Sequence, residues 1–518
     1  MFAKVAFLCR FGSLVLLIAL SSTSWATGGG FFESPQSYNS GGVDANSMAV
    51  ADLNGDGNLD LVVSNIEGAG CHGGGVGVLL GNGDGTFKTA QTYCTSGGGY
   101  SSIFVADLNN DGNPDLIIAN EFFSVNDLDD GGIAVLLGNG DGTFQPAQSY
   151  KSGGGGAESV IVADLNSDGK PDVVVANCSK TGENCQDPPF GSPTGNVGVL
   201  LGKGDGTLQP VAEYDSGGLH AVVVLAADVN GKGELDLIVA HRCVSPADCG
   251  DGVVSILQGN GDGTFQPAVV CDNYHGERPS SMALADVNYD GKLDLLIGGI
   301  FTVGVSLGNG DGTFRDAVTY PTGGFIVNSI AFGDVNGDSV PDLLTGSRCA
   351  RTFCIGGSVG VLRGNGDGTF EAFKAFPSYG EVAASIALAD VNGDGRLDLL
   401  VADMCAHNVH CSSGAAVVFL NASRFRTTTN LSSSLNPSKY GQAVTFTATV
   451  TPSGPDPLRG RVRFWDGTRS LGAGNMSGGV ATLTKSTLAI GTHSITAQYL
   501  GDSSNGKSTS SAVEQVVQ

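Results

Sequence analysis

The chain has 518 residues, of which 41% are hydrophobic and 81 are glycine, and its formal net charge is -25 at pH 7. That length suits a large repeat assembly with a small second domain. The acidic balance argues against binding to nucleic acid or to an anionic membrane, both of which need a basic surface. It favours cations or cationic partners, although an acidic surface kept for solubility gives the same composition.

Residues 1–26 have the pattern of a secretory signal peptide. Lys4 and Arg10 precede the apolar run 14–20, and Ser24 and Ala26 are the small residues expected before a cleavage site. The apolar run is too short to span a bilayer. We therefore expect a mature chain without a transmembrane segment, either secreted or held at the cell surface or in the periplasm. A retained N-terminal anchor is the alternative.

Residues 27–423 repeat one unit. The motif "DLNGDGNLD", which starts at Asp52, has seven copies at intervals of 48 to 64 residues, and we number these acidic loops one to seven. The later copies start at Asp107, Asp164, Asp228, Asp286, Asp334 and Asp390. A second motif, "GNGDGTF", first occurs at Gly81 and alternates with the acidic loops in six copies. Such self-similarity is typical of repeat architectures.

Each unit is predicted to form four short strands. In the first unit these are "SMAVA" (47–51) before the acidic loop, "LDLVVSN" (59–65) after it, "VGVLL" (76–80), and the outer strand "TFKTAQTY" (86–93). Seven such units predict an all-β fold with a seven-bladed β-propeller. A linear β-solenoid is the rival architecture, but its rungs are usually much shorter.

The ends of the repeat region favour a closed ring. The seventh unit lacks both the "GNGDGTF" motif and the outer strand, whereas "FESPQSYNSGG" (32–42) matches the outer-strand segment "FQPAQSYKSGG" (144–154). We therefore predict that the N-terminal strand completes the seventh blade. This pairing removes exposed strand edges.

The spacing D-x-N-x-D-G-x-x-D predicts a Ca²⁺ site in the acidic loop. Side-chain oxygens at positions one, three, five and nine, with the main-chain carbonyl of position seven, make a set of hard oxygen ligands. Strands flank the loop, and the twelfth-position glutamate of an EF-hand is absent. The alternative is a series of ordinary Asp/Gly turns, but repeated carboxylates at positions one, five and nine favour the cation.

We expect about six structural Ca²⁺ sites, one in every loop except the fourth. There Lys232 stands at position five, where its ammonium replaces the cation; in the sixth loop Ser339 replaces a glycine and weakens the site. The candidate ligands are Asp52, Asn54, Asp56, Asn58, Asp60, Asp107, Asn109, Asp111, Asn113, Asp115, Asp164, Asn166, Asp168, Lys170, Asp172, Asp286, Asn288, Asp290, Lys292, Asp294, Asp334, Asn336, Asp338, Val340, Asp342, Asp390, Asn392, Asp394, Arg396 and Asp398.

The repeat resembles the FG-GAP/VCBS family, the unit of the integrin α-subunit propeller and of many exported bacterial proteins. The resemblance covers about residues 31–420 and rests on the acidic loop in tandem. It implies Ca²⁺ in the hairpin between the first and second strands of a blade, and ligands on the opposite face. It implies no particular activity, because one fold supports many functions.

Cysteine, histidine and arginine residues gather in the loops of that opposite face. Four cysteine pairs are close in sequence and are predicted to form loop disulfides: Cys178/Cys185, Cys243/Cys249, Cys349/Cys354 and Cys405/Cys411. Cys71 can meet Cys94, and the partner of Cys271 is left open. Loops on a rigid scaffold often bind ligands, although polar residues collect in loops in any case. The basic residues placed on this face are His72, His220, His241, His275, His407, His410, Arg242, Arg278, Arg348 and Arg351.

Residues 424–518 are predicted to form an immunoglobulin-like β-sandwich. A Ser/Thr-rich segment (426–438) is expected to be a linker leading into the first strand. Alternating apolar and polar residues then predict strands at 443–450, 461–466, 479–485, 493–502 and 512–517. The segment "ITAQYLGD" resembles the bacterial Ig-like repeat family, which implies a spacer or adhesive role.

The combined prediction is an exported calcium-binding propeller that acts in extracellular ligand binding or adhesion. Its expected partner is an extracellular protein or glycan. A secreted polysaccharide hydrolase or lyase is one alternative, and a purely structural envelope component is another. The sequence contains no G-x-S-x-G, H-E-x-x-H or P-loop motif, so no catalytic residue is assigned.

Overall fold

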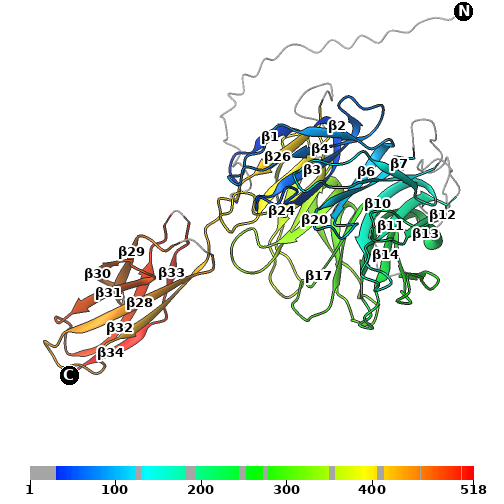
Figure 1. Cartoon of the computed structure of the whole chain (residues 1–518). Coiled ribbons are helices and arrows are strands. Elements are labelled where there is room, and N and C mark those ends of the chain that lie inside the picture. Colours follow the sequence, from blue (N-terminus) through cyan, green and yellow to red (C-terminus); the bar gives the residue numbers. More distant parts are fainter. Residues whose placement is uncertain are drawn as a thin grey trace, which may run out of the picture.

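The computed structural model describes residues 31–123, 130–180, 194–243, 252–271, 278–348, 356–404, 413–454, 457–502 and 504–518. The predicted signal peptide, residues 1–26, lies outside them. Every regular element in these ranges is a β-strand, and they contain no helix of the length and apolar character that a membrane crossing needs. Figure 1 shows a propeller built from β1 to β26 and a separate elongated β-domain built from β27 to β34.

The repeat region forms seven antiparallel four-stranded blades, as the sequence predicts. Blade 1 is β2 (Gly42–Ala51), β3 (Asp60–Gly68), β4 (Gly75–Leu79) and β5 (Gln91–Cys94); blade 2 is β6 (Gly98–Ala106), β7 (Asp115–Phe122), β8 (Gly132–Leu136) and β9 (Gln148–Lys151). Blade 3 is β10 (Gly155–Ala163), β11 (Asp172–Ser179), β12 (Thr194–Leu200) and the first part of β13 (Ala212–Ala227).

Blade 4 is the rest of β13, β14 (Asp236–Cys243), β15 (Val253–Leu257) and β16 (Val269–Cys271). Blade 5 is β17 (Ser281–Ala285), β18 (Asp294–Gly298), β19 (Ile300–Ser306) and the first part of β20 (Val318–Gly333). Blade 6 is the rest of β20, β21 (Asp342–Ser347), β22 (Ser358–Leu362) and β23 (Lys374–Pro377). Blade 7 is β24 (Ala383–Ala389), β25 (Asp398–Asp403), β26 (Ala415–Phe419) and β1 (Gln36–Asn39).

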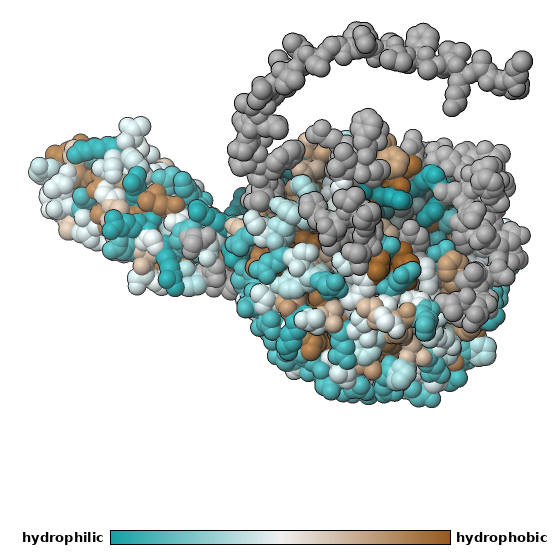
Figure 2. All heavy atoms as spheres, turned by 90° about the horizontal axis from the view of Figure 1, so that it is seen from above, coloured by the Kyte–Doolittle hydropathy of each residue, from teal (hydrophilic) through white to brown (hydrophobic). Residues whose placement is uncertain are grey.

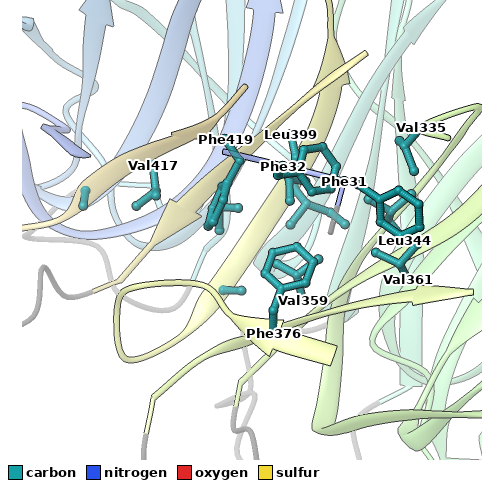
Figure 3. Packing of buried hydrophobic residues seen from close by; sticks show 14 residues of the cluster. Phe31, Phe32, Val335, Leu344, Val359, Val361, Phe376, Leu399, Val417 and Phe419 are labelled. Carbon is teal, nitrogen blue, oxygen red and sulfur yellow. The ribbon is translucent and has the colours of Figure 1, made fainter. Parts of the chain in front are cut away.

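The N-terminal strand β1 is the outer strand of blade 7, as predicted. Gln36–Asn39 pair antiparallel with Ala415–Val418 of β26 (Figure 1). Immediately before β1, Phe31 and Phe32 are buried, and the ring of Phe32 contacts the rings of Phe376 and Phe419 (Figure 3). These aromatic contacts fix the start of the repeat region to its end.

Neighbouring blades pack face to face. The second and third strands of each blade are buried along most of their length because both of their faces are covered, and β3 and β4 illustrate this. Leu61 and Val63 of blade 1 share one buried cluster with Leu400 and Val418 of blade 7. The first and last blades therefore contact each other as other neighbours do.

The C-terminal domain is a two-sheet sandwich, as predicted. One sheet is β27 (Thr427–Ser433), β28 (Val444–Pro452) and β31 (Val480–Lys485); the other is β30 (Arg469–Asn475), β29 (Arg461–Asp466), β32 (Gly491–Tyr499) and β33 (Ser508–Thr509), with β34 (Val513–Val517) also paired to β32. Phe446, Phe464 and Tyr499 fill the space between the sheets.

Two features of this domain differ from the prediction. Most of the segment expected to be a linker is strand β27, because it pairs along its whole length with β28 and alternately buries Thr427 and Thr429. Strand β30 was not predicted, since "RSLGAGN" has no apolar alternation. It forms by pairing with β29.

Candidate functional site

Each acidic loop joins the first two strands of its blade and curls around its own side chains. In the first loop the two Oδ atoms of Asp52 accept the N–H groups of Asp56 and Gly57, at 3.2 and 2.8 Å. Asn54 Oδ1 accepts the Asp56 N–H at 2.9 Å. Gly55 and Gly57 have φ angles of 68° and 84°, which glycine adopts at little cost. The oxygens of positions one, three and five are thereby turned toward one tight loop.

This arrangement recurs around the ring. In the second, third, fifth and seventh loops the N–H of position five again bonds to the side chains of both positions one and three; the donors are Asp111, Asp168, Asp290 and Asp394. Apart from the buried residue at position two, positions one to eight lie near the surface, with Asn58, Asn113, Lys170 and Lys292 at position seven. The repeated sequence therefore produces one repeated loop conformation.

Position nine is different, because its carboxylate is fully buried at the start of the second strand. Asp60 Oδ2 accepts the Leu53 N–H at 2.9 Å, and Oδ1 accepts the Gly81 N–H at 2.7 Å. Gly81 begins the "GNGDGTF" hairpin, so Asp60 ties the two hairpins of its blade together. Asp115, Asp172, Asp294 and Asp342 make the same pair of bonds.

This structural role was not predicted from the sequence. Burial raises the pKa of Asp60, the Gly81 and Leu53 N–H groups lower it, and the charges of Asp56 and Asp52 raise it. The sequence did contain a signal for this role. In most blades the aspartate at position nine precedes the next "GNGDGTF" motif by about twenty residues.

The donor set of the intact loops fits a hard cation such as Ca²⁺. All the side-chain donors are carboxylate or amide oxygens, which this ion prefers. A carboxylate oxygen keeps a second lone pair after accepting one hydrogen bond, so the bonds to Asp60 leave it able to coordinate. Asp52, Asn54, Asp56 and Asp60, with the carbonyl of Asn58, would hold the ion in the first loop.

The loops do not form the tightest titratable cluster. Within the described ranges, the one group of three His, Cys, Asp or Glu residues whose ligand atoms all lie within 4.8 Å is Glu158, Cys178 and His220. Cys178 is disulfide-bonded, so it offers no thiolate. The loop carboxylates converge less closely because position nine is directed toward backbone N–H groups.

The fourth and sixth loops, which depart from the motif, also differ in their hydrogen bonds. Asn230 Nδ2 donates to Asp236 Oδ2 at 2.7 Å, and Asn336 Nδ2 donates to Asp342 Oδ2 at 3.1 Å. An amide nitrogen thus occupies the side of the ninth carboxylate that faces the loop. In the sixth loop Ser339 has a φ of 68°, a strained conformation for a residue with a Cβ atom.

The residue at position seven contacts position five in two loops. Lys170 Nζ lies 3.3 Å from Asp168 Oδ2. In the seventh loop the guanidinium of Arg396 bonds to Asp394 Oδ2 through both Nε and Nη2, and Nη1 donates to the Ser423 carbonyl at 3.1 Å. The seventh loop is therefore connected to the chain that leaves the propeller.

A second feature lies on the propeller axis. A cavity of about 600 Å³ is bounded by the inner strands of all seven blades and by residues that follow the ends of the second strands, such as Arg348 and Met404. We call it the central pocket. The second strands run away from the acidic loops, so the pocket opens on the opposite face. The sequence placed ligand-binding loops on this face.

A ring of serines surrounds the central pocket. A serine precedes the first aspartate of the acidic loop by five residues in every blade except the fourth, where Val223 replaces it. Ser47 Oγ accepts the Ile103 N–H of the next blade at 3.3 Å, and Ser329 Oγ accepts the Ile386 N–H at 3.1 Å. These serines link neighbouring blades, and the sequence repeat contained the signal for them.

The inner strands bulge beside these serines. A register shift next to the serine position leaves one residue of each affected strand unpaired, and these residues line the pocket: Asn46, Glu158, Val222, Asn328 and Ala384. Bulges often redirect a side chain beside a functional site. Here they place side chains of varied chemistry from five blades at the pocket wall.

Charged residues divide the pocket wall into two sides. Glu121 and Glu158 come from blades 2 and 3, whereas Arg242, Arg278 and Arg348 come from blades 4 to 6 and the connections between them. The structure therefore brings together three of the arginines that the sequence assigned to this face. In the view of Figure 2, hydrophilic and hydrophobic residues are interspersed over the described part of the surface, without one large apolar patch.

Two histidines assigned to surface loops are buried, which corrects that expectation. His220 is 3% exposed, and its Nε2 lies 3.4 Å from Glu158 Oε1. His241 is fully buried within β14, and burial lowers its pKa to about 4. His241 is therefore a neutral core residue at pH 7, and its ring lies against Gly218 of β13.

The cysteine predictions are partly tested. Cys71 and Cys94 form the predicted disulfide. Cys178 and Cys243 are also disulfide-bonded. The remaining predicted partners, together with several histidines and one arginine assigned to this face, lie outside the described residues: Cys185, Cys249, Cys349, Cys354, Cys405, Cys411, His275, His407, His410 and Arg351.

Comparison with known proteins identifies both parts of the chain. Residues 68–118, 119–175, 228–297 and 352–401 match the FG-GAP-like repeat family, and residues 431–518 match the bacterial Ig-like domain, group 3. A search of curated protein sequences gives no match.

Solved structures to which this chain is similar include two proteins. One is an Agrocybe aegerita lectin described as recognising non-reducing terminal N-acetylglucosamine, with 23% identity, a TM-score of 0.43, and coverage of 65% of this chain and 81% of the lectin. The other is the extracellular domain of a one-component system from B. thetaiotaomicron, with 10% identity, a TM-score of 0.42, and coverage of 93% of this chain and 58% of that chain.

Proposed function

Because the chain belongs to the FG-GAP-like repeat proteins and ends in a bacterial Ig-like domain, we propose that it is an exported, calcium-stabilised propeller that binds an extracellular ligand in the central pocket. The Ig-like domain acts as a spacer or adhesive module. An extracellular protein or glycan is the expected class of partner.

The central pocket is the observation that carries the binding proposal. Its volume of about 600 Å³ lies within the range of about 300 to 1,000 Å³ that is typical of ligand sites. Its wall combines serine and asparagine side chains with five charged residues and the ring of Phe325. A few converging polar groups in a concave site give a ligand both affinity and a fixed orientation.

The acidic loops support the calcium part of the proposal. Six Ca²⁺ ions carry twelve positive charges, which would bring the formal net charge of -25 to about -13. Extracellular sites of this class bind at roughly 10⁻⁴ to 10⁻³ M. At about 1 mM Ca²⁺ each site would add on the order of 0.4 to 1.4 kcal/mol to the free energy of unfolding. The ions would therefore stabilise the blades and leave the opposite face available for binding.

A binding screen of the full chain tests the proposal. The protein is applied with 1 mM Ca²⁺ (about the extracellular level) to arrays of glycans and peptides, beside the variants Arg348→Ala and Arg315→Ala. Arg315 is an exposed arginine that directly follows a "GNGDGTF" motif, on the face of the acidic loops. We expect a ligand whose signal is lost only in Arg348→Ala. Equal loss of signal in both variants, or the absence of any bound ligand, would refute the pocket as the binding site. Turnover of a bound glycan would show that the protein is an enzyme and would overturn the binding proposal.

A further inference from the structure

We propose that the central pocket selects a saccharide that carries a carboxylate, with the anionic group held on the side of Arg242, Arg278 and Arg348. This inference rests on the proposed function and names the class of its ligand. Its basis is the division of charge in the pocket wall, together with the hydroxyl and amide groups between the two charged sides.

The arginines converge in a chain that is otherwise strongly acidic. The protein has 26 Lys and Arg against 51 Asp and Glu, yet three guanidinium groups from separate elements line this one cavity. A guanidinium is a planar fork that pairs with a carboxylate through two parallel hydrogen bonds. An anionic ligand group would therefore find its preferred partners on this side of the pocket. The rest of the acidic surface would repel it.

The backbone holds these arginines in place. The Arg348 N–H donates to the Ile326 carbonyl at 3.0 Å. Arg242 lies within β14 beside the disulfide-bonded Cys243, and Arg278 precedes the buried Pro279. The main chain is therefore anchored at Arg242 and Arg348, and at Arg278 it leads directly into a buried residue.

The opposite side of the pocket would orient the ligand. Glu158 lies there with the nearly buried His220 behind it, 3.4 Å from Oε1, and Glu121 is its neighbour in the wall. Carboxylates repel an anionic group and accept hydrogen bonds from sugar hydroxyls. The anionic group of the ligand is therefore directed to the arginine side of the pocket, and its hydroxyl groups are directed to the glutamate side.

The groups between the two charged sides suit a sugar better than a peptide side chain. The serine ring presents hydroxyls whose oxygens accept backbone N–H groups at 3.1 to 3.4 Å, as at Ser47, Ser159 and Ser329. The hydroxyl hydrogens of Ser47 and Ser159 can then reach a ligand oxygen, whereas Ser281 and Ser329 donate to the carbonyls of Val327 and Ile386. Phe325, whose ring packs edge to face on Phe301 with centroids 5.1 Å apart, adds an aromatic surface at the wall.

Calorimetric titration of the full chain with three oligosaccharides tests the assignment. The ligands are an oligouronate, its neutral methyl ester and a sulfated oligosaccharide of equal length, all in buffer with Ca²⁺. We expect the oligouronate to bind, and the ester to bind at least about tenfold more weakly, because charge-assisted hydrogen bonds are lost. Added salt should weaken oligouronate binding. Arg278→Ala and Arg348→Ala should each lose about tenfold or more in affinity, with the melting temperature and the affinity of Arg315→Ala unchanged.

The outcomes separate this inference from the proposed function. Two results would refute carboxylate selection: equal binding of the oligouronate and its ester, or tighter binding of the sulfated ligand. If Arg348→Ala still lowers the affinity in such a case, the pocket remains a ligand site. If Arg278→Ala and Arg348→Ala bind the oligouronate as tightly as the wild type does, both carboxylate selection and the pocket as the binding site are refuted. Failure of all three oligosaccharides would refute the saccharide assignment, and the array screen would then decide the proposed function.

Discussion

The guanidinium of Arg396 lies over the ring of Phe425, with its Cζ atom 5.2 Å from the ring centroid. Arg396 is position seven of the seventh acidic loop, and Phe425 opens the C-terminal domain, where it forms a bridge with Asn505. The sixth loop adds contacts at the same place, because the Gly337 carbonyl accepts the Arg426 N–H and the Ser453 hydroxyl, each at 3.2 Å. Two neighbouring acidic loops therefore hold the Ig-like domain.

We expect Arg396→Ala to loosen this junction without unfolding either domain. The substitution removes the stacking on Phe425 and the bond to Ser423, contacts worth on the order of 1 to 2 kcal/mol in a half-buried setting. Small-angle scattering should show a broader distribution of distances between the domains, and limited proteolysis should cut faster between them. Lys170→Ala is the matched control, because Lys170 occupies the same position in the third loop and its ammonium pairs with Asp168 of that loop. Equal changes in both variants would contradict this role.

Calcium stoichiometry should follow the residue at position five. Lys232→Asp restores the acidic set of the fourth loop, so we expect one more Ca²⁺ per chain than in the wild type, whereas Asp56→Asn should lower the affinity of the first loop. Equilibrium dialysis with metal analysis gives the count. The calcium-induced rise in melting temperature should be larger in Lys232→Asp and smaller in Asp56→Asn. An unchanged count in both variants, or a melting temperature that responds to neither Ca²⁺ nor chelator, would refute the cation sites.

The ninth aspartate should stabilise its blade with or without the cation. Asp60→Ala leaves the buried N–H groups of Leu53 and Gly81 without their acceptor, at a cost of about 2 to 5 kcal/mol in the free energy of unfolding. Denaturant unfolding in the presence of a chelator measures this cost. Asp84→Ala is the control, because Asp84 is an exposed carboxylate in the neighbouring hairpin and accepts bonds only from Thr86 within the loop. A cost for Asp60→Ala that appears only with Ca²⁺ would mean that Asp60 acts solely as a ligand.

Much of the propeller was predictable from its repeats. The acidic motif fixes where the first hairpin of each blade turns, and the similarity of segments 32–42 and 144–154 was enough to pair β1 with β26. The disulfide Cys71–Cys94 followed from the positions of both residues within blade 1. These inferences succeed because a repeat carries the same local signals many times.

The central pocket was only partly predictable. The sequence assigned Arg242, Arg278 and Arg348 to one face, but their convergence depends on how seven blades meet around an axis, which no single repeat contains. His241 was assigned to a surface loop, whereas it lies within β14 with its ring against Gly218 of β13. The double hydrogen bonding of Asp60 also links two hairpins, so its role is invisible within either motif alone.

Asp403, at the end of β25, should make stability depend on pH. The residue is fully buried, and its Oδ1 accepts the Val382 N–H at 3.0 Å. Burial raises the pKa of Asp403 from 3.8 to about 6, although hydrogen bonds from Ser378 and Val382 lower it. Because the folded chain holds this proton more tightly than the unfolded chain, the contribution is fully present below about pH 4 and is lost as the pH rises through about 6.

Asp403→Asn keeps an oxygen for the Val382 N–H and cannot ionise, so it should remove this dependence. We expect the variant to be more stable than the wild type at pH 7.5 by up to about 3 kcal/mol, with the difference shrinking toward pH 4. Urea unfolding at several pH values, with chelator throughout, measures the difference. Asp316→Asn serves as the control, because it makes the same change at an exposed position. A constant difference between Asp403→Asn and the wild type, or a variant that is less stable at pH 7.5, would show that the buried carboxylate is not under strain from its charge.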